Sequence, residues 1–270
     1  MAKVDTADIL QILQPMWTSK TETAKRVQGR IENILDYARS VGLREGENPA
    51  RWKGHLSHTL PTPSKVTKVQ HQRALPYKEA PALVAALGGL DTHASRALRL
   101  TIYCATRTSE TLQASWSEID LEARLWTIPA ERMKAGKPHR IPLTADAVEL
   151  LRQQETLRRD DWVFPGQKLK QSLSNMAMTN VLKRIDWLDR TTVHGLRSTF
   201  RDWVADCTTY PDRLAEVALA HQLADRVQAA YNRTDMMDKR RGMMEAWAQF
   251  LKAKPGKVLT LPTSAAGSMQ

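Results

Sequence analysis

The stretch SWSEIDLEARLWTIPAERMKAGKPHRIPL, residues 115–143, interrupts a chain that otherwise has a helical pattern. Its tryptophans, isoleucines and alternating polar residues are typical of short strands. Two strand candidates, LWTIPA and HRIPL, lie on either side of the turn-like sequence KAGK. We therefore expect a small antiparallel sheet, with Lys134 at or near a hairpin turn.

Helical patterns surround this stretch. Apolar residues recur every three or four positions in DTHASRALRLTIYCA and in TADAVELLRQQETL, as they do on one face of a helix. A longer helix is expected from Thr21, its N-cap, to Gly42, its stop, with basic side chains beside the apolar face. A shorter helix is expected at about residues 6–13, and a further helical candidate follows NPARW. The fold class is thus mainly α (α+β).

The 270 residues are enough for two modest domains. The sequence HTLPTPSKVTKVQHQRALPY has no sustained period, contains prolines and carries basic residues, so we expect a linker there. It would lie along a phosphate backbone or serve only as a solvated tether. The expected parts are a small helical domain (1–60), a basic linker (61–76), a mostly helical domain with the sheet (77–253) and a disordered tail (254–270).

The charge balance points to a polyanionic partner. Forty Lys and Arg against 29 Asp and Glu give a net charge of +11, and the pI is about 9.8. A nucleic acid and an acidic membrane surface would both suit this excess. No apolar run approaches the roughly 18 residues of a membrane span, and no signal-peptide pattern begins the chain, so we expect a cytoplasmic protein. Cys104 and Cys207 lie in apolar stretches and are expected to be small core residues.

The familiar cofactor and metal motifs are absent from the sequence. It has no phosphate-binding glycine loop, no dinucleotide-binding glycine pattern and no H-E-x-x-H, and its histidines do not cluster at zinc spacing. We expect no cofactor and no metal. What remains is a set of cationic side chains and one tyrosine: Arg107, Lys134, His194, Arg197, His221 and Tyr231. Each alone has a structural explanation, such as a helix-end Arg107 that bonds Glu110, or a Tyr231 that packs in the core.

Taken in order, the motifs TRTSE, ERMKAGKPHRIPL, HGLRSTFRDW, ALAH and AAYNR make the sequence resemble the tyrosine recombinases, the phage integrase family. Within it the sequence resembles the integrases of satellite phages and genomic islands. The resemblance covers essentially the whole chain, including the NPARW turn. It implies a helical core-DNA-binding domain followed by a mostly helical catalytic domain with a small antiparallel sheet.

The same resemblance implies a role for each cationic residue and the tyrosine. Arg107 and Arg197 would clamp the non-bridging oxygens of a scissile phosphate, because the guanidinium fork suits them. His194 and His221 would add hydrogen bonds, and His194 would also help to take the tyrosine proton. Tyr231 would attack the phosphorus, and the general acid Lys134 would protonate the departing 5′ oxygen; positioned cations stabilise such a transition state without a metal.

Five other basic residues are candidates for DNA contact. They lie in the first expected helix-rich part and in the linker: Lys25, Arg26, Arg30, Lys65 and Lys68. Near a helix start, His194 and Arg197 would face a bound phosphate, and Gly195 would let a DNA backbone come close.

Three further features complete the comparison with the family. Its usual glycine before the first arginine is replaced, since CATR holds Ala105 and Thr106. The chain begins so shortly before LQPMWTSKTETA that we expect an N-terminally truncated integrase. In the C-terminal segment MMDKRRGMMEAWAQFLKA, apolar residues recur at helical spacing, which favours core packing over contact with a neighbouring protomer.

The expected function is site-specific DNA recombination, in which duplex DNA is cut and rejoined through a 3′-phosphotyrosyl bond to integrate or excise a mobile element. The expected partners are double-stranded attachment sites and accessory DNA-bending proteins. We expect a homotetramer on DNA and a monomer in the absence of DNA. No membrane partner is expected. The protein would associate with the nucleoid when bound to DNA. Two alternatives stay open: a type IB topoisomerase, and a non-catalytic DNA-binding remnant.

Overall fold

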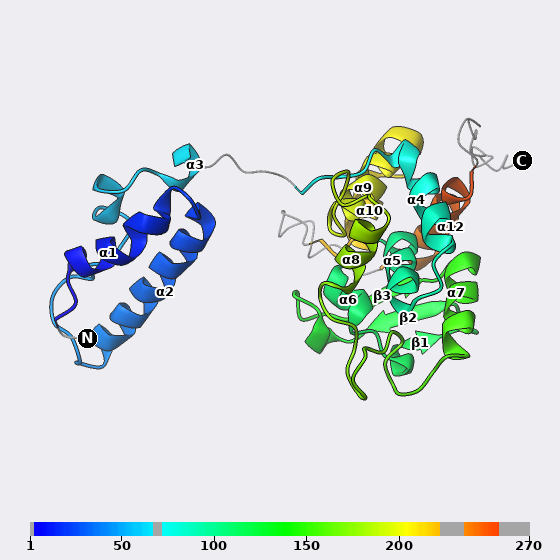
Figure 1. Ribbon diagram of the computed structural model, residues 1–270, viewed down its shortest axis with the longest axis horizontal. Helices are drawn as coiled ribbons and strands as arrows, with labels where there is room; N and C mark the ends of the chain where they lie inside the picture. Colours follow the sequence, from blue (N-terminus) through cyan, green and yellow to red (C-terminus); the bar gives the residue numbers. More distant parts are fainter. Residues whose placement is uncertain (1–2, 67–71, 222–234, 254–270) are drawn as a thin grey trace, which may run out of the picture. The chain divides into compact units, whose positions relative to one another are not determined.

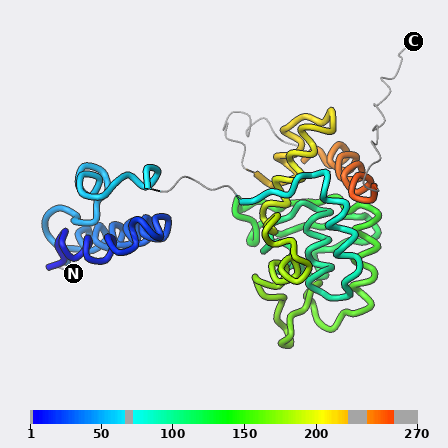
Figure 2. The backbone as a smooth tube through the Cα atoms, turned by 45° about the horizontal axis from the view of Figure 1, so that its top comes forward, coloured from blue at the N-terminus to red at the C-terminus, as the bar shows by residue number. Residues whose placement is uncertain are grey.

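The structure is a computed structural model that describes residues 3–66, 72–221 and 235–253. Its contacts divide the chain into two compact units, Met1–His71 and Gln72–Gln270. Figure 1 shows the elements of each unit, and Figure 2 follows the backbone through them. The expected disordered tail, 254–270, lies outside the described residues. Across those residues, no helix is both long enough and apolar enough to cross a membrane.

The first unit consists of two packed helices and the turns that follow them. Helix α1 (Thr6–Trp17) begins with a capping box in which the Asp5 and Asp8 side chains each accept a backbone N–H of the other residue. Helix α2 (Thr21–Ser40) lies against α1, and the short helices η1 (Leu56–His58) and α3 (Pro63–Val66) follow. A small apolar core joins them, in which the Trp17 and Trp52 rings stack at 5.4 Å.

The ends of α2 only partly match the expectation. Gly42 follows the helix with φ +73°, a left-handed conformation that favours glycine, and its N–H bonds the Arg39 carbonyl. Thr21, however, is not the N-cap: Lys20 is, and Thr21 is the first helical residue. Its buried hydroxyl donates to the Trp17 carbonyl at 2.8 Å, so it ties α2 to the end of α1.

The division between the units falls inside the segment expected to be a linker, 61–76. Both ends of this segment are packed. Helix α3 contacts α2 in the first unit, and Leu75 is buried in the core of the second. Residues 67–71 lie outside the described residues.

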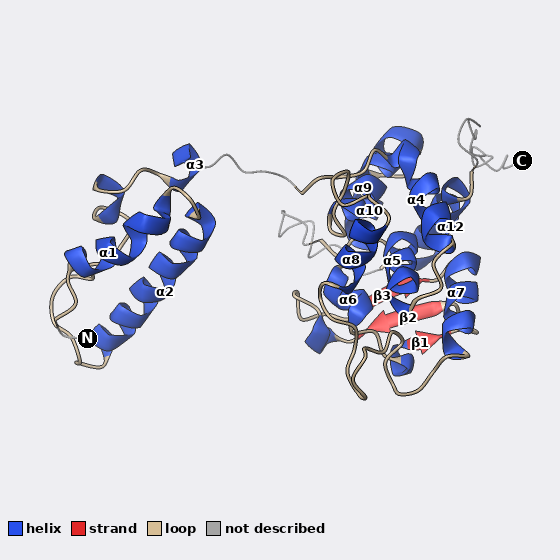
Figure 3. Cartoon of the chain, in the orientation of Figure 1, coloured by secondary structure: helices blue, strands red, loops and turns tan. Residues whose placement is uncertain are grey.

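The second unit is mainly helical with one small sheet, as Figure 3 shows. Before the sheet come η2 (Tyr77–Glu79), α4 (Ala80–Gly88), α5 (His93–Cys104), α6 (Thr108–Leu112) and η3 (Trp116–Glu118). After it come α7 (Ala145–Glu155), α8 (Ala177–Arg184), α9 (Gly195–Cys207), α10 (Asp212–Ala218) and α12 (Met237–Leu251). This arrangement confirms the expected mainly α fold.

The sheet has three antiparallel strands in the order β1 (Ile119–Asp120), β2 (Leu125–Ile128), β3 (His139–Pro142). Strands β2 and β3 pair with Ile128 opposite His139, which confirms the expected hairpin. Their connection contains η4 (Ala130–Arg132) and the turn that carries Lys134. Strand β1 was not expected, because a strand of two residues is too short to show an alternating pattern in the sequence.

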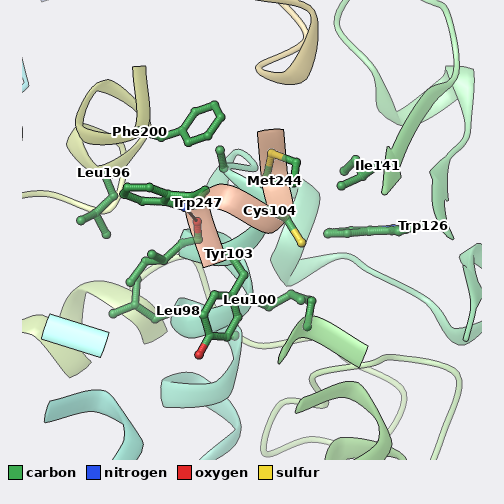
Figure 4. Packing of buried hydrophobic residues seen from close by; sticks show 14 of the residues in the cluster. Leu98, Leu100, Tyr103, Cys104, Trp126, Ile141, Leu196, Phe200, Met244 and Trp247 are labelled. Carbon is green, nitrogen blue, oxygen red and sulfur yellow. Dashed lines mark hydrogen bonds between the residues drawn. The ribbon is translucent and has the colours of Figure 1, made fainter. Parts of the chain in front are cut away.

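The core of the second unit gathers around helix α5 and the aromatic residues of α9 and α12. Trp247 lies 5.0 Å from Trp203 between ring centroids, and its indole N–H donates to the Ile102 carbonyl. Figure 4 shows Trp247 beside Phe200 and Leu196. The stripe on α12 is therefore core, as expected, with Met243 and Trp247 at 0% and 1% exposure.

The two cysteines differ. Cys104 is buried in this core, as expected, and burial raises the pKa of its thiol to about 12. Cys207 is exposed, so its assignment as a core residue was wrong. It is the last residue of α9, and the apolar residues around it in the sequence lie on the other faces of that helix. Phe200, Trp203 and Val204 are the residues that point inward there.

Candidate functional site

Arg197 is the most buried of the predicted site residues that the structure describes, with 4% of its surface exposed. It lies in the first turns of α9, and its guanidinium donates to the backbone carbonyls of Ala105 and Leu219. These carbonyls fix the guanidinium but do not cancel its charge. Burial, and next the Arg107 charge, lower the pKa of Arg197 from 12.5 to about 10, so the group stays cationic at neutral pH.

Ala105 provides one of these carbonyls from an unusual backbone position. It ends α5 with φ 51° and ψ 33°, in the left-handed region that alanine rarely occupies. A glycine would take this conformation more easily than an alanine does. The chain keeps the turn with alanine, at a backbone cost of about 1 kcal/mol.

Arg107 is fixed by a carboxylate and by a backbone carbonyl just after α10. It is the N-cap of α6, and the Glu110 side chain accepts both its backbone N–H, at 2.7 Å, and its Nη1, at 2.6 Å. Nη2 donates to the Ala220 carbonyl at 2.9 Å. The helix-end pairing with Glu110 is thus present, and the same pairing aims the guanidinium toward the end of α10.

His221 is held between a carboxylate and an arginine. Its Nδ1 lies 2.7 Å from Glu216 Oε2, and its Nε2 lies 3.3 Å from Arg197 Nη2. Glu216 also accepts from Arg201 Nε at 2.6 Å. Burial raises the pKa of Glu216, but the hydrogen bonds from Arg201 and His221 outweigh it and leave that pKa below 4.5. Glu216 is therefore an anion that orients His221.

A pocket of about 370 Å³ brings three of the predicted cationic residues together. Arg107, Lys134 and His221 line it from the α5–α6 turn, the β2–β3 connection and the end of α10. The other lining residues are Met133, Ala135, Glu216 and Ala220. Lys134 therefore reaches the same space as Arg107 and His221, although these residues are far apart in the sequence.

His194 stands beside this group at the start of α9. It is the N-cap residue and is exposed, in contrast to the buried Arg197 one helical turn later. Partial burial, and then the charges of Arg197, Arg107 and His221, lower the pKa of His194 below 6.5. Its imidazole is therefore neutral at pH 7 and able to accept a proton.

His139 is a site neighbour that the sequence analysis did not single out, although it belongs to the quoted motif ERMKAGKPHRIPL. It is 9% exposed on β3. Burial, then the Arg240 charge, lower the pKa of His139 to about 4, and nearby Glu110 and the interaction with the Ala218 backbone oppose the shift. A neutral His139 thus lies near Ala218, the last residue of α10, just before the carbonyls that bind Arg107 and Arg197.

Glu216 had no signal in the sequence that distinguishes it from other helical carboxylates. His139 did have one, because a histidine within a predicted buried strand needs a polar partner. Tyr231 lies outside the described residues. On the C-terminal side of it, the Asp235 carboxylate pairs with Arg140 of β3 at 3.0 Å.

The predicted DNA-binding residues belong to the first unit. Lys25, Arg26 and Arg30 are exposed on α2, and Arg26 pairs with Glu22 at 3.0 Å. Lys25 also lines a pocket of about 380 Å³ beside Trp17 and Trp52. Lys65 is exposed on α3, and Lys68 lies outside the described residues. Among the described residues, no three His, Cys, Asp or Glu gather where a metal ion could be held.

The expected role of Gly195 was wrong. A Cβ built on Gly195 would lie 1.9 Å from the backbone oxygen of Arg73 and 2.7 Å from its carbonyl carbon. The space beside this glycine is therefore occupied by the chain's own backbone, so no DNA backbone can take that place.

The chain is similar in sequence to known integrases. The chain is 33% identical over 243 residues to prophage integrase IntZ of Escherichia coli (strain K12), a match that covers 89% of this chain and 58% of that one. It is 28% identical over 263 residues to the integrase of Enterobacteria phage P4, covering 90% and 58%. The chain thus spans about 58% of the length of these relatives.

Solved structures share the fold. A lambda integrase dimer bound to a COC′ core site matches with a TM-score of 0.58 at 17% identity, over 87% of this chain and 82% of that one. The Tn1549 transposon integrase in complex with a circular intermediate DNA matches with a TM-score of 0.55 at 13% identity, over 87% of each.

Two family profiles cover the units in turn. The phage integrase central domain matches residues 1–55, in the first unit. The phage integrase family matches residues 73–237, which include every predicted catalytic residue and more than half of the chain. The similarity to the phage P4 integrase is also consistent with the satellite-phage branch. The chain therefore belongs to the phage integrase family.

Proposed function

We propose that the protein is a site-specific DNA recombinase that cuts and rejoins duplex DNA at the attachment sites of a mobile element. The observation that supports this most directly is the pocket in which Arg107, Lys134 and His221 meet, with the charged Arg197 fixed beside His221. Such a set suits a phosphodiester, because cations placed around a phosphate stabilise the extra charge of its transition state.

Each side chain would then have one task. The Arg107 and Arg197 guanidinium groups would bind the non-bridging oxygens of the scissile phosphate, and His221 would hydrogen-bond the same group. Both arginines are already oriented, by Glu110 and by backbone carbonyls, so little side-chain freedom is lost when the phosphate binds.

The reaction would be a transfer of the phosphoryl group to a phenol. The Tyr231 oxygen forms a bond to phosphorus as the bond to the 5′ oxygen breaks, which gives a 3′-phosphotyrosyl linkage and a free 5′ end. Lys134 donates a proton to the departing oxygen, and His194 accepts the phenolic proton. The lowered pKa of His194 supports its part, because only a neutral imidazole can take a proton.

A 5′ hydroxyl from a partner duplex would reverse these steps. Because the phosphotyrosyl bond preserves the phosphodiester free energy, resealing needs no nucleotide cofactor. We propose double-stranded attachment sites as the substrate and a homotetramer on DNA as the active assembly. Lambda integrase is described bound to DNA as a dimer and as a tetramer, which supports this assembly.

The first unit would bind DNA through the basic face of α2. Lys25, Arg26 and Arg30 are exposed there, and the net charge of +11 favours a polyanion. Lys65 would extend this contact, and we include Lys68 on sequence grounds only. The site of action would be the nucleoid in the cytoplasm, with accessory DNA-bending proteins as further partners.

The experiment is a covalent trap. Nicked duplexes that tile the genomic DNA on both sides of the coding sequence are incubated with the protein and then denatured in SDS. A stable protein–DNA adduct is expected with wild type and with Tyr37→Phe, an exposed tyrosine in the first unit. Tyr231→Phe should give no adduct, and an adduct that persists in this variant would reject Tyr231 as the nucleophile.

The same preparations separate the alternatives. Strand exchange between two duplexes supports a recombinase, whereas relaxation of supercoiled plasmid without exchange would support a type IB topoisomerase. Sequence-preferring retention of DNA with no adduct at any pH or salt would support a DNA-binding remnant.

A further inference from the structure

Residues 73–75, here called the 73–75 segment, lie across the first turn of helix α9. The Arg73 carbonyl accepts hydrogen bonds from the Thr192 N–H and from the Thr191 hydroxyl, both at 3.2 Å. The Thr199 hydroxyl donates to the Leu75 carbonyl at 2.7 Å. The segment is therefore attached on both sides of Gly195.

Buried surroundings make this attachment rigid. Leu75 is 1% exposed, Thr191 is 0% exposed and Thr199 is 1% exposed, so the hydrogen bonds of these two hydroxyls are made away from water. Buried polar groups that lose a partner cost more than exposed ones. On the surface side, Arg73 Nη1 donates to the Asp189 carbonyl at 2.9 Å.

Gly195 is the residue that makes the contact possible. Its missing Cβ leaves the space that the Arg73 peptide occupies, since a Cβ there would be 1.9 Å from the Arg73 oxygen and 3.1 Å from the Ala74 nitrogen. The obstacle is backbone, which cannot rotate away as a side chain can. A side chain at position 195 would force either the 73–75 segment or the first turn of α9 to move.

The first turn of α9 carries two of the proposed catalytic residues. His194 directly precedes Gly195, and Arg197 follows two residues later. Arg197 reaches its carbonyl partners on two other elements, so a shift of this turn would break contacts that fix its guanidinium. Displacements of about 1 Å at a catalytic group can lower a rate about 100-fold.

We propose that the 73–75 segment, seated against Gly195, positions His194 and Arg197 for the reaction, and that Gly195 is a positioning residue. The second unit begins at Gln72, so the 73–75 segment is among its first residues, and it is packed against helix α9. The inference rests on the proposed function for its effect on DNA cleavage, but the contact itself can be tested without DNA.

The test uses the full chain with Gly195→Ala. Its matched control is Gly88→Ala, the same change in helix α4, where a Cβ would meet nothing within 4 Å. Limited trypsin digestion measures cleavage after Arg73 relative to cleavage after the exposed Lys65. Gly195→Ala should speed cleavage after Arg73 about tenfold or more, whereas wild type and Gly88→Ala should protect it.

Two further measurements ask whether the contact positions the site. The His194 ring resonance, assigned with His194→Gln, is titrated by NMR, and its midpoint should shift in Gly195→Ala. Adduct formation with the nicked duplexes should fall between about 10-fold and 100-fold in Gly195→Ala and should be unchanged in Gly88→Ala.

A second pair of variants covers the case in which Gly195→Ala does not fold. Thr199→Val removes the hydroxyl that donates to Leu75 and should lower adduct formation about threefold, with a smaller increase in cleavage after Arg73. Thr199→Ser keeps the hydroxyl and should restore both values.

The outcomes are distinct. If the bond after Arg73 stays protected in Gly195→Ala, the contact between the 73–75 segment and Gly195 is refuted. Faster trypsin cleavage after Arg73, without any change in the His194 titration or in adduct formation, would refute the positioning role. If wild type forms no adduct, the proposed function fails, while the digestion and the titration still decide this inference.

Discussion

At the scale of single residues, arginines, carboxylates and histidines of the site are held in different ways. The buried Arg197 guanidinium is bound by the neutral carbonyls of Ala105 and Leu219, so its positive charge remains for an anionic ligand. Carboxylates are used instead to orient partners: Glu110 holds Arg107 and Glu216 holds His221. Two histidines carry no such charge: burial and neighbouring cations lower the pKa of His194 and of His139, so both are neutral.

Glu216→Gln should separate cleavage from DNA binding. The change removes the charge that orients His221, and charge-assisted hydrogen bonds contribute about 1.5–3 kcal/mol, so the cleavage rate should fall about tenfold. Because a negative charge also leaves the pocket, the affinity for the attachment site should stay equal or rise. Single-turnover cleavage and gel-shift assays measure the two effects. Glu149→Gln, an exposed carboxylate on α7, is the control, and parallel loss of binding and cleavage would contradict this role.

His139 should make stability depend on pH. Its pKa is about 4 in the folded protein and about 6.5 when unfolded, so the unfolded chain binds more protons between these values. The stabilising effect is complete above pH 6.5 and is lost as the pH falls toward 4, by about 3 kcal/mol at most.

Urea unfolding at pH 7.5 and at pH 4.5, followed by tryptophan fluorescence, measures this dependence. His139→Gln should be less stable than wild type at pH 7.5 and should lose less stability on acidification. An equal loss in the two proteins would show that another group titrates.

At the scale of elements, the β-sheet and the helix ends deliver side chains to one place. The β2–β3 connection brings Lys134 to the pocket, the α5–α6 turn brings Arg107, and the end of α10 brings His221. His139 of strand β3 also lies near Ala218 at this end of α10. The sheet is small, but its β2–β3 connection lines the pocket in which the phosphate is proposed to bind.

The turn between β1 and β2 offers a test of backbone strain in this sheet. Arg124 is exposed and has φ 51°, where a non-glycine residue costs about 1 kcal/mol. Arg124→Gly should therefore raise the free energy of unfolding by up to about 1 kcal/mol and raise Tm. Ala123→Gly, an exposed neighbour with negative φ, should lower stability or leave it unchanged. Calorimetry decides, and a lower Tm for Arg124→Gly would contradict the strain argument.

At the scale of the whole molecule, the two units hold different sets of candidate residues. The proposed catalytic residues within the described chain belong to the second unit, and the basic DNA-binding candidates belong to the first. The family profiles follow the same division, with 1–55 matched by the central domain and 73–237 by the phage integrase family. Affinity and cleavage should therefore respond to different sets of substitutions.

Salt dependence of DNA binding tests this division. Each phosphate contact adds about 0.9 to the slope of log Kd against log salt, so the double variant Lys25→Gln, Arg30→Gln should lower the slope by about 2. Lys183→Gln, an exposed lysine on α8, should leave it unchanged. Fluorescence anisotropy with a labelled attachment site measures both, and an unchanged slope in the double variant would remove α2 from the DNA contact.

The sequence by itself determined the local elements and the chemical inventory. Helical spacing and turn residues act over a few positions, so the α2 helix with its stop at Gly42 and the hairpin around Lys134 could be predicted. The order of the motifs was also sufficient to identify the family. Thr21 was assigned wrongly because its hydroxyl serves a neighbouring helix rather than the first turn of its own.

Only the tertiary structure decided which atoms meet. Arg197 bonds the carbonyl of a residue 92 positions away, and Arg107 bonds one 113 positions away. No local pattern encodes such a pair, because it depends on how whole helices pack. The same reason explains why Glu216 was missed, why Cys207 is exposed, and why the space beside Gly195 belongs to the Arg73 backbone rather than to DNA.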